Sequence, residues 1–165
     1  MATIKRILCP IDFSEGSSAA LEHALFFVER FGAELELLHA WQIPYSVRPD
    51  LMLWMEAGVS QSIFEATRDQ AATAMQQQVA QIPAALRART EGRTVHGDPV
   101  TAILDALGGK TYDMVVMGTH GRTGFSHLLM GSVAERVVRR SPVPVLTVRQ
   151  PKASKHAAET AASAH

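Results

Sequence analysis

Short apolar runs alternate with longer amphipathic stretches along most of the chain. The apolar runs lie at residues 4–11, 35–41, 114–117 and 143–148, with a weaker one at 87–95. Short runs rich in leucine, isoleucine and valine are typical of strands that are buried on both faces. Between them, apolar residues recur at the spacing of one face of a helix. The pattern therefore predicts strands and helices in alternation, beginning and ending with a strand.

The predicted helices have recognisable start signals. Ser14 is a good N-cap for the first helix, and Ser62 with Glu65 forms a capping box for the second. Asp98 followed by Pro99 opens the third, because Asp caps well and Pro fits the first turn. The residues expected to end the helices are Gly32, Pro83, Gly108 with Gly109, and Ser141 with Pro142.

This alternation predicts an α/β domain over residues 1–150, with an open parallel sheet of five strands and helices on both faces. Pro144 cannot donate a hydrogen bond to a neighbouring strand, so the last strand is expected at an edge of the sheet. Residues 42–60 are long for a connection and apolar near 51–55, which indicates a packed flap or a helical turn. Residues 151–165 have no periodicity and are expected to form a disordered tail.

The composition is that of an ordinary globular domain, with 165 residues, 47% of them hydrophobic and 19% charged. Lys and Arg number 16, as do Asp and Glu, and this balance argues against nucleic acid as the main partner. No apolar run is long enough to cross a membrane, and the N-terminus lacks the pattern of a signal peptide. The single cysteine, Cys9, lies in an apolar run and is expected to be a buried, inert thiol. These features favour a reducing, cytoplasmic location.

The most informative stretch is the glycine-rich segment that follows the fourth predicted strand. Gly118 and Gly121 open it, and Gly131 with Ser132 precedes the last helix. Glycines allow backbone N–H groups to approach an anion, and a helix N-terminus adds unpaired donors and a partial positive charge. Ser132 adds a hydroxyl, and Arg122 adds a full positive charge. The segment therefore has the features of a phosphate-binding loop, with a plain chain turn as the alternative.

The spacing of these glycines excludes the two best-known nucleotide motifs. A Rossmann fingerprint requires G-x-G-x-x-G, whereas Gly118, Gly121 and Gly124 are each three residues apart. A Walker A loop ends in G-K-[ST], which Gly109 and the two residues after it provide. That motif also requires glycine at the position of Leu104, so it is excluded as well.

The order Gly118, two residues, Gly121, nine residues, Gly131 and Ser132 resembles the signature of the universal stress protein family in its ATP-binding branch. The resemblance extends over roughly residues 3–149. It includes the segments 10–14, 37–39, 97–99 and 141–146.

The resemblance implies a fold like that of the adenine nucleotide alpha hydrolases, with strand order 3-2-1-4-5. It also implies a homodimer formed through the last strand, from Val143 to Val148, and a role in stress tolerance in which bound nucleotide acts as a conformational or assembly signal. In that order the first and fourth strands are neighbours whose connections leave in opposite directions. Ligands of open α/β sheets bind at such a switch point, where Asp12 and Gly118 would meet.

Each candidate residue has a nucleotide-binding role and a plainer alternative. Asp12 can hold Mg²⁺ together with ATP, hydrogen-bond the nucleoside, or simply belong to a turn before the first helix. The resemblance places the backbone of Ala40 near the base, and Met117 is expected as a wall for adenine or as ordinary core. His120 can touch a phosphate or remain exposed. The predicted nucleotide-binding residues are Pro10, Ile11, Asp12, Ala40, Met117, Gly118, His120, Gly121, Arg122, Gly131, Ser132, Val133 and Ala134.

Three functions are open to such a chain. The first is an ATP-binding regulatory protein, with cyclic AMP or another adenine nucleotide as possible ligands. The second is a slow ATPase or phosphotransferase, which the missing P-loop lysine and the lone acidic residue argue against. The third is a dimeric scaffold that needs no nucleotide and offers the apolar segment near residues 52–55 to a protein partner. The histidines lack the spacing of a zinc site, and no G-x-S-x-G motif of a serine hydrolase is present.

Overall fold

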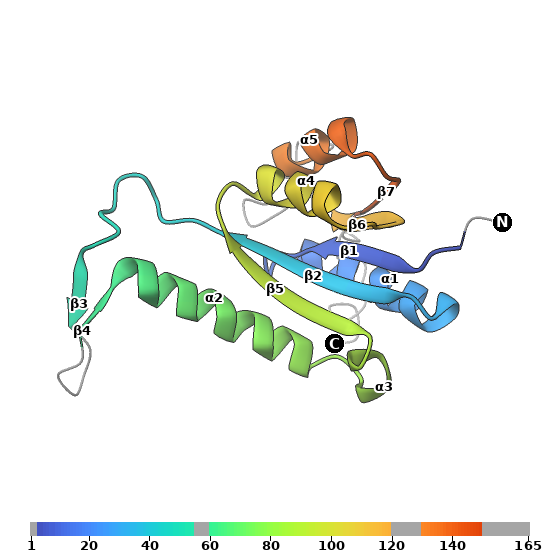
Figure 1. Ribbon diagram of the computed structural model, residues 1–165, viewed down its shortest axis with the longest axis horizontal. Coiled ribbons are helices and arrows are strands. Elements are labelled where there is room, and N and C mark those ends of the chain that lie inside the picture. Colours follow the sequence, from blue (N-terminus) through green and yellow to red (C-terminus); the bar gives the residue numbers. More distant parts are fainter. Residues whose placement is uncertain (1–2, 55–59, 120–129, 150–165) are drawn as a thin grey trace, which may run out of the picture.

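The central element of the computed structural model, which describes residues 3–54, 60–119 and 130–149, is a five-stranded parallel sheet in the order β5-β2-β1-β6-β7 (Figure 1). The strands are β1 (Arg6–Pro10), β2 (Glu34–Trp41), β5 (Thr90–His96), β6 (Met114–Gly118) and β7 (Val145–Val148). Two further strands, β3 (Met52–Trp54) and β4 (Ser60–Ser62), form a separate antiparallel hairpin. Without that hairpin the order corresponds to 3-2-1-4-5, which confirms the predicted fold class.

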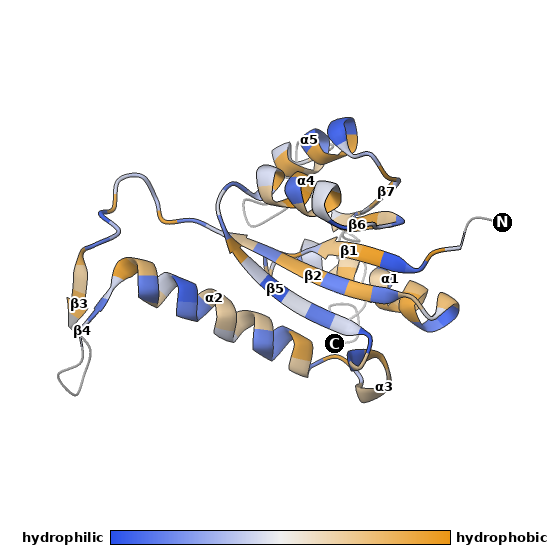
Figure 2. Cartoon of the chain, viewed as in Figure 1, coloured by the Kyte–Doolittle hydropathy of each residue, from blue (hydrophilic) through white to orange (hydrophobic). Residues whose placement is uncertain are grey.

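Helices cover both faces of the sheet. They are α1 (Glu15–Phe31), α2 (Ile63–Ala80), α3 (Ala84–Arg87), α4 (Pro99–Gly109) and α5 (Ser132–Arg140). Figure 1 shows α4 and α5 on one side of the strands and α1, α2 and α3 on the other. Along β1, Ile7 and Cys9 face α1, whereas Leu8 faces α4 and α5, so the sheet divides the core into two apolar clusters. Figure 2 shows hydrophobic residues prominent along β1 and α1, and mostly hydrophilic or neutral residues along the edge strand β5.

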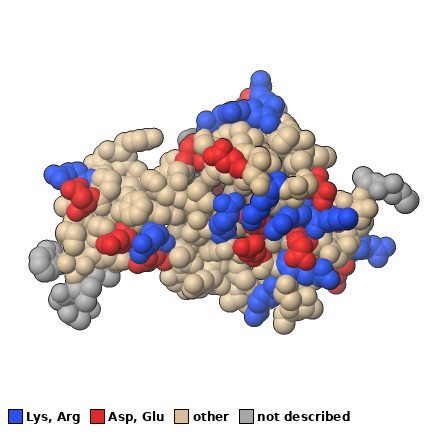
Figure 3. Space-filling view, in the orientation of Figure 1, with Lys and Arg blue, Asp and Glu red and all other residues tan. Residues whose placement is uncertain are grey.

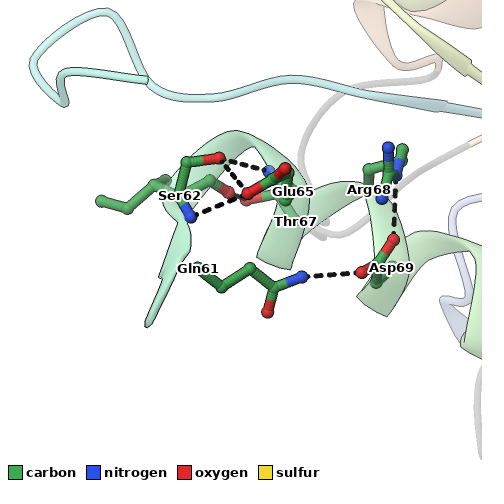
Figure 4. Close-up of polar contacts among 7 residues, drawn as sticks. Gln61, Ser62, Glu65, Thr67, Arg68 and Asp69 are labelled. Atoms are coloured by element: carbon green, nitrogen blue, oxygen red, sulfur yellow. Dashed lines mark hydrogen bonds and ion pairs between the residues drawn. The ribbon is translucent and has the colours of Figure 1, made fainter. Parts of the chain in front are cut away.

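The predicted helix starts are confirmed. Ser14 accepts a hydrogen bond from the backbone N–H of Ser17, and Asp98 accepts one from the N–H of Thr101. The capping box before α2 is complete, because the Ser62 side chain and the Glu65 carboxylate each accept the other residue's backbone N–H (Figure 4). Each bond satisfies a donor that the first turn of a helix leaves unpaired.

Some predicted boundaries are wrong. Gly108 and Gly109 are not a C-cap but the last residues of α4, and the capping position belongs to Lys110 in an extended conformation. The weak strand expected from residue 87 begins only at Thr90, because Arg87 closes the short helix α3. The predicted ends at Gly32 and near Pro83 hold, and Gly32 adopts the left-handed conformation that favours glycine.

The last strand lies at the sheet edge, as Pro144 predicted. Pro144 precedes β7, and its carbonyl accepts a hydrogen bond from the N–H of Val115. Part of the segment 42–60 is the β3–β4 hairpin rather than a helical turn, and Leu51 and Met52 are exposed there. The predicted tail, 151–165, lies outside the described residues.

Three further features bear on function. Cys9 is fully buried, which confirms its predicted burial, and burial raises the pKa of its thiol to about 12. No helix in the described part of the chain has the length and apolar character needed to cross a membrane. On the face seen in Figure 3, basic and acidic side chains are interspersed rather than separated into patches of one sign.

Candidate functional site

The two central strands, β1 and β6, separate near their carboxyl ends. Their pairing ends at Leu8 and Val115. The N–H of Asp113 donates to the carbonyl of Arg6, so the even-numbered residues of β1 turn their backbone groups toward β6. Pro10 therefore stands where the next donor to β6 would be needed, and proline has no N–H. The missing donor explains why the strands part at the point where their connections leave in opposite directions.

A cavity of about 320 Å³ opens between the separated strand ends, which is within the range of small-molecule sites. The predicted site residues that line it are Pro10, Ile11, Asp12, Ala40, Met117, Gly118, Gly131, Ser132, Val133 and Ala134. Sequence reasoning did not place five further lining residues, which are Ser17, Leu38, Pro99, Ile103 and Thr119. The predicted His120, Gly121 and Arg122 lie outside the described residues.

One wall of the cavity is apolar. Leu38 of β2 and Met117 of β6 form it from the sheet side, and Ile103 of α4 faces them. All three side chains are at least nine-tenths buried and belong to the same core cluster. A wall of this kind suits a flat, largely apolar ring system. Ile103 thus belongs both to the core and to the cavity lining, which only the fold reveals.

The N-terminus of α5 also borders the cavity. Gly131 is the N-cap, adopts an extended conformation and forms no side-chain cap, while its own N–H donates to the carbonyl of Thr119 at 2.6 Å. The N–H groups of Ser132, Val133 and Ala134 belong to the first turn, which has no intrahelical partners for them. With the partial positive charge of the helix end, these donors form a site suited to an anion.

The Asp12 carboxylate lies at the mouth of the cavity and also holds a turn. Its Oδ1 accepts hydrogen bonds from the N–H of Ser14 at 3.1 Å and from the Ser14 hydroxyl at 2.5 Å. The turn before α1 is one of the three roles predicted for Asp12, and these bonds confirm it. No group of three acidic, histidine or cysteine side chains that could hold a metal occurs within 3–54, 60–119 or 130–149. A metal role for Asp12 therefore remains a prediction that depends on the nucleotide supplying further ligands.

Gly118 is needed at the cavity for a steric reason. A Cβ atom on this residue would lie 2.8 Å from the carbonyl oxygen of Gly16 and 2.9 Å from its carbonyl carbon. The end of β6 therefore contacts the backbone of the first turn of α1. A side chain at position 118 would force the two elements apart.

Comparison with known proteins gives a consistent result. Residues 3–149 match the model of the universal stress protein family. Universal stress protein MJ0531 of Methanocaldococcus jannaschii is 30% identical over 149 residues, which cover 90% of this chain and 84% of that protein. The solved structure of MJ0577, from the same organism, is 27% identical, with a TM-score of 0.72 and coverage of 92% of this chain and 99% of that one. A universal stress protein solved in complex with cAMP shares the fold, with 21% identity, a TM-score of 0.65 and coverage of 91% and 100%.

Proposed function

Because the chain belongs to the universal stress protein family, we propose that it binds an adenine nucleotide, with ATP as the expected ligand, in the cavity between β1 and β6. One observation carries this proposal: an apolar wall leads to the uncapped N-terminus of α5 within a single cavity. The wall suits a base, and the helix end suits phosphate. The cAMP complex of a protein with the same fold supports adenine nucleotides as the ligand class.

In this proposal, different residues contact the base and the phosphates of the nucleotide. The base lies against Met117 and Leu38, and the phosphates lie at the first-turn N–H groups of α5. Ser132 adds its hydroxyl there. Gly121 and Arg122, which lie outside the described residues, stay phosphate ligands predicted from the sequence. A Mg²⁺ ion bound through the phosphates would take Asp12 as its protein ligand, since Mg²⁺ usually needs few carboxylates.

The nucleotide is proposed to act as a regulatory signal in a stress response rather than as a substrate. Phosphoryl transfer needs charge stabilisation at the γ-phosphate and a group that positions the attacking water. Among the described residues, Asp12 is the acidic one that lines the cavity, and the Ser14 hydroxyl donates a hydrogen bond to one of its oxygens. Chromatography of nucleotide incubated with the protein for hours, with Gly121→Ala as a control, tests this. Recovery of unchanged ATP is expected, and rapid conversion to ADP would show an enzyme.

Substituting Ser132 tests the proposed phosphate site. Ser132→Glu places a carboxylate in the first turn of α5, where it favours the helix but repels phosphate. Saturating MgATP at about a hundredfold the dissociation constant should stabilise the wild-type protein by about 2.7 kcal/mol, and should not stabilise this variant. Thermal unfolding with and without MgATP measures the difference.

The matched control is Ser132→Gln, which has nearly the same shape and no charge. It should keep most of the stabilisation by MgATP. Equal stabilisation of the Glu variant and the wild type would contradict a phosphate site at this helix end. A wild-type protein that is not stabilised and that purifies without nucleotide would favour a scaffold that needs none.

We also propose a cytoplasmic homodimer that forms through β7, the edge strand. The even-numbered residues of β7 bond to β6, so the N–H of Thr147 faces outward. Thr147→Pro removes that outward donor without breaking the β6 ladder. We expect the variant to be monomeric by light scattering where the wild type is dimeric. A Thr147→Pro dimer as stable as the wild-type dimer would place the interface elsewhere.

A further inference from the structure

His39 is a buried polar residue on β2 directly behind the cavity. Its side chain is 8% exposed, its Nδ1 lies 2.9 Å from the carbonyl oxygen of Ile11, and its ring centroid lies 4.5 Å from that of Phe13. A carbonyl oxygen only accepts, so Nδ1 carries the hydrogen and donates it. His39 is therefore a hydrogen-bonded residue of the core. Its acceptor, the carbonyl of Ile11, is not one that the sequence predicts.

In a regular continuation of the sheet, the carbonyl of Ile11 would accept a hydrogen bond from the N–H of Ala40. The β1–β2 register ends with Pro10 opposite Leu38, and the N–H of Ile11 still donates to the carbonyl of Leu38 at 2.9 Å. One further step of a regular parallel ladder would have the N–H of Ala40 donate to the carbonyl of Ile11. His39 donates to that carbonyl instead. The even-numbered residues of β2 turn their backbone groups toward β1, since the N–H of Glu34 donates to the carbonyl of Lys5. The N–H of Ala40, a residue that lines the cavity, therefore lies on the β1 side of β2.

The turn at Phe13 likewise removes the ladder hydrogen bond that the carbonyl of Ala40 would accept. A continued ladder would bring the N–H of Phe13 to that carbonyl, but Phe13 has a φ of +62° and turns the chain away from β2. Left-handed backbone is costly for a bulky residue and persists only where its surroundings hold it. The His39 ring packs against Phe13, and Asp12 bonds Ser14 on the other side of the turn.

We infer that His39 is a positioning residue which keeps the N–H and C=O of Ala40 available to the edge of an adenine base. This inference rests on the proposed function, because it concerns how the same cavity distinguishes its ligands. Adenine presents an acceptor, N1, beside a donor, the N6 amino group, which matches an N–H beside a C=O. Guanine presents the opposite pair, N1–H beside O6. An open Ala40 backbone therefore favours ATP over GTP without any side-chain contact to the base.

The test compares dissociation constants for ATP and GTP by calorimetric titration. His39→Phe keeps a ring against Phe13 but removes the donor, so the carbonyl of Ile11 recruits the N–H of Ala40. ATP should bind about tenfold more weakly, which corresponds to one lost hydrogen bond, while GTP binding should not change. His39→Asn places an amide N–H where Nδ1 stood and should restore the ATP preference. His23→Phe is the matched control, since Nδ1 of this exposed histidine also bonds a backbone carbonyl, that of Ala19 at 2.9 Å, but on α1.

The outcomes separate the two proposals. A wild-type protein that binds neither nucleotide would overturn the proposed function. The role of His39 alone would be overturned if the wild type prefers ATP and His39→Phe keeps that preference. The same conclusion would follow if His39→Phe lost affinity for ATP and GTP equally. Should the Phe variant not fold, His39→Asn and His39→Gln give the same test. Both are amides, but only Asn brings its nitrogen to the Nδ1 position, so only Asn should keep the ATP preference.

Discussion

Replacing Glu36 with glutamine is expected to lower the free energy of unfolding by about 3 kcal/mol, the lower end for breaking a buried ion pair. Glu36 lies on β2 with 1% of its side chain exposed, and it accepts three charged or polar donors. Arg93 Nε lies 2.7 Å from Oε1, and Lys110 Nζ and Tyr112 Oη lie 2.8 and 2.6 Å from Oε2. Without the carboxylate, two cations remain close together with no counter-charge. Their partial exposure, 36% and 39%, limits the loss.

The effect should depend on pH. Burial alone would raise the pKa of Glu36, but the hydrogen bonds from Lys110, Tyr112 and Arg93 outweigh it and hold the pKa below its ordinary value of 4.5. A group with a lowered folded-state pKa stabilises the protein above its unfolded pKa and loses that contribution as the pH falls through the folded value. The difference between wild type and Glu36→Gln should therefore be full at neutral pH and shrink below about pH 4.5. Urea unfolding across this range measures it.

Glu34 on the same strand is the matched control. It pairs with Arg89 at 3.4 Å, but the two side chains are 59% and 49% exposed, so Glu34→Gln should cost about 0.5 kcal/mol or less. Equal losses for the two variants would mean that the buried cluster contributes no more than a surface ion pair.

The second large effect is expected for Gly118→Ala, which should cost about 2–3 kcal/mol of stability through overpacking. The added Cβ would lie 2.8 and 2.9 Å from backbone atoms of Gly16, which cannot rotate away as a side-chain end would. Since β6 and α1 both border the cavity, their separation should also weaken ATP binding. Chemical unfolding and nucleotide titration on the same variant measure both effects.

Gly108→Ala is the same substitution at another position, and we expect it to raise the stability of the protein rather than lower it. Gly108 is exposed within α4, and a Cβ there would meet nothing within 4 Å. Alanine should stabilise the helix by about 0.5–1 kcal/mol. A Gly118→Ala protein as stable as the wild type would show that β6 and α1 do not contact each other as tightly as described.

The fold was largely predictable because its signals are local. Ser14, Ser62 and Asp98 cap helices through bonds within one turn, and Pro144 indicated an edge strand. The wrong boundary at Gly108 arose because glycine often ends a helix, whereas here α4 continues through it to Gly109. The strand order came from family resemblance, since periodicity carries no information on which strands are neighbours.

The candidate site was predictable only in part. Residues at strand ends, such as Asp12 and Gly118, were found because ligands of parallel sheets collect at those ends. Ile103 was missed as a cavity residue because the apolar sequence pattern of a helix is the same whether its buried face packs on the core or borders a cavity. The bond between His39 and Ile11 joins residues 28 positions apart and depends on the register of two strands, which sequence reasoning did not supply.

The central claim is that a nucleotide occupies the crevice between β1 and β6 with its phosphates at the start of α5. Amide chemical shifts recorded during an MgATP titration test it most directly. We expect the largest shifts at the N–H groups of Ser132, Val133, Ala134 and Ala40, saturating together at one dissociation constant. Saturating ATP that leaves these amides unmoved, or that shifts a cluster elsewhere, such as the face between β5 and α4, would contradict it.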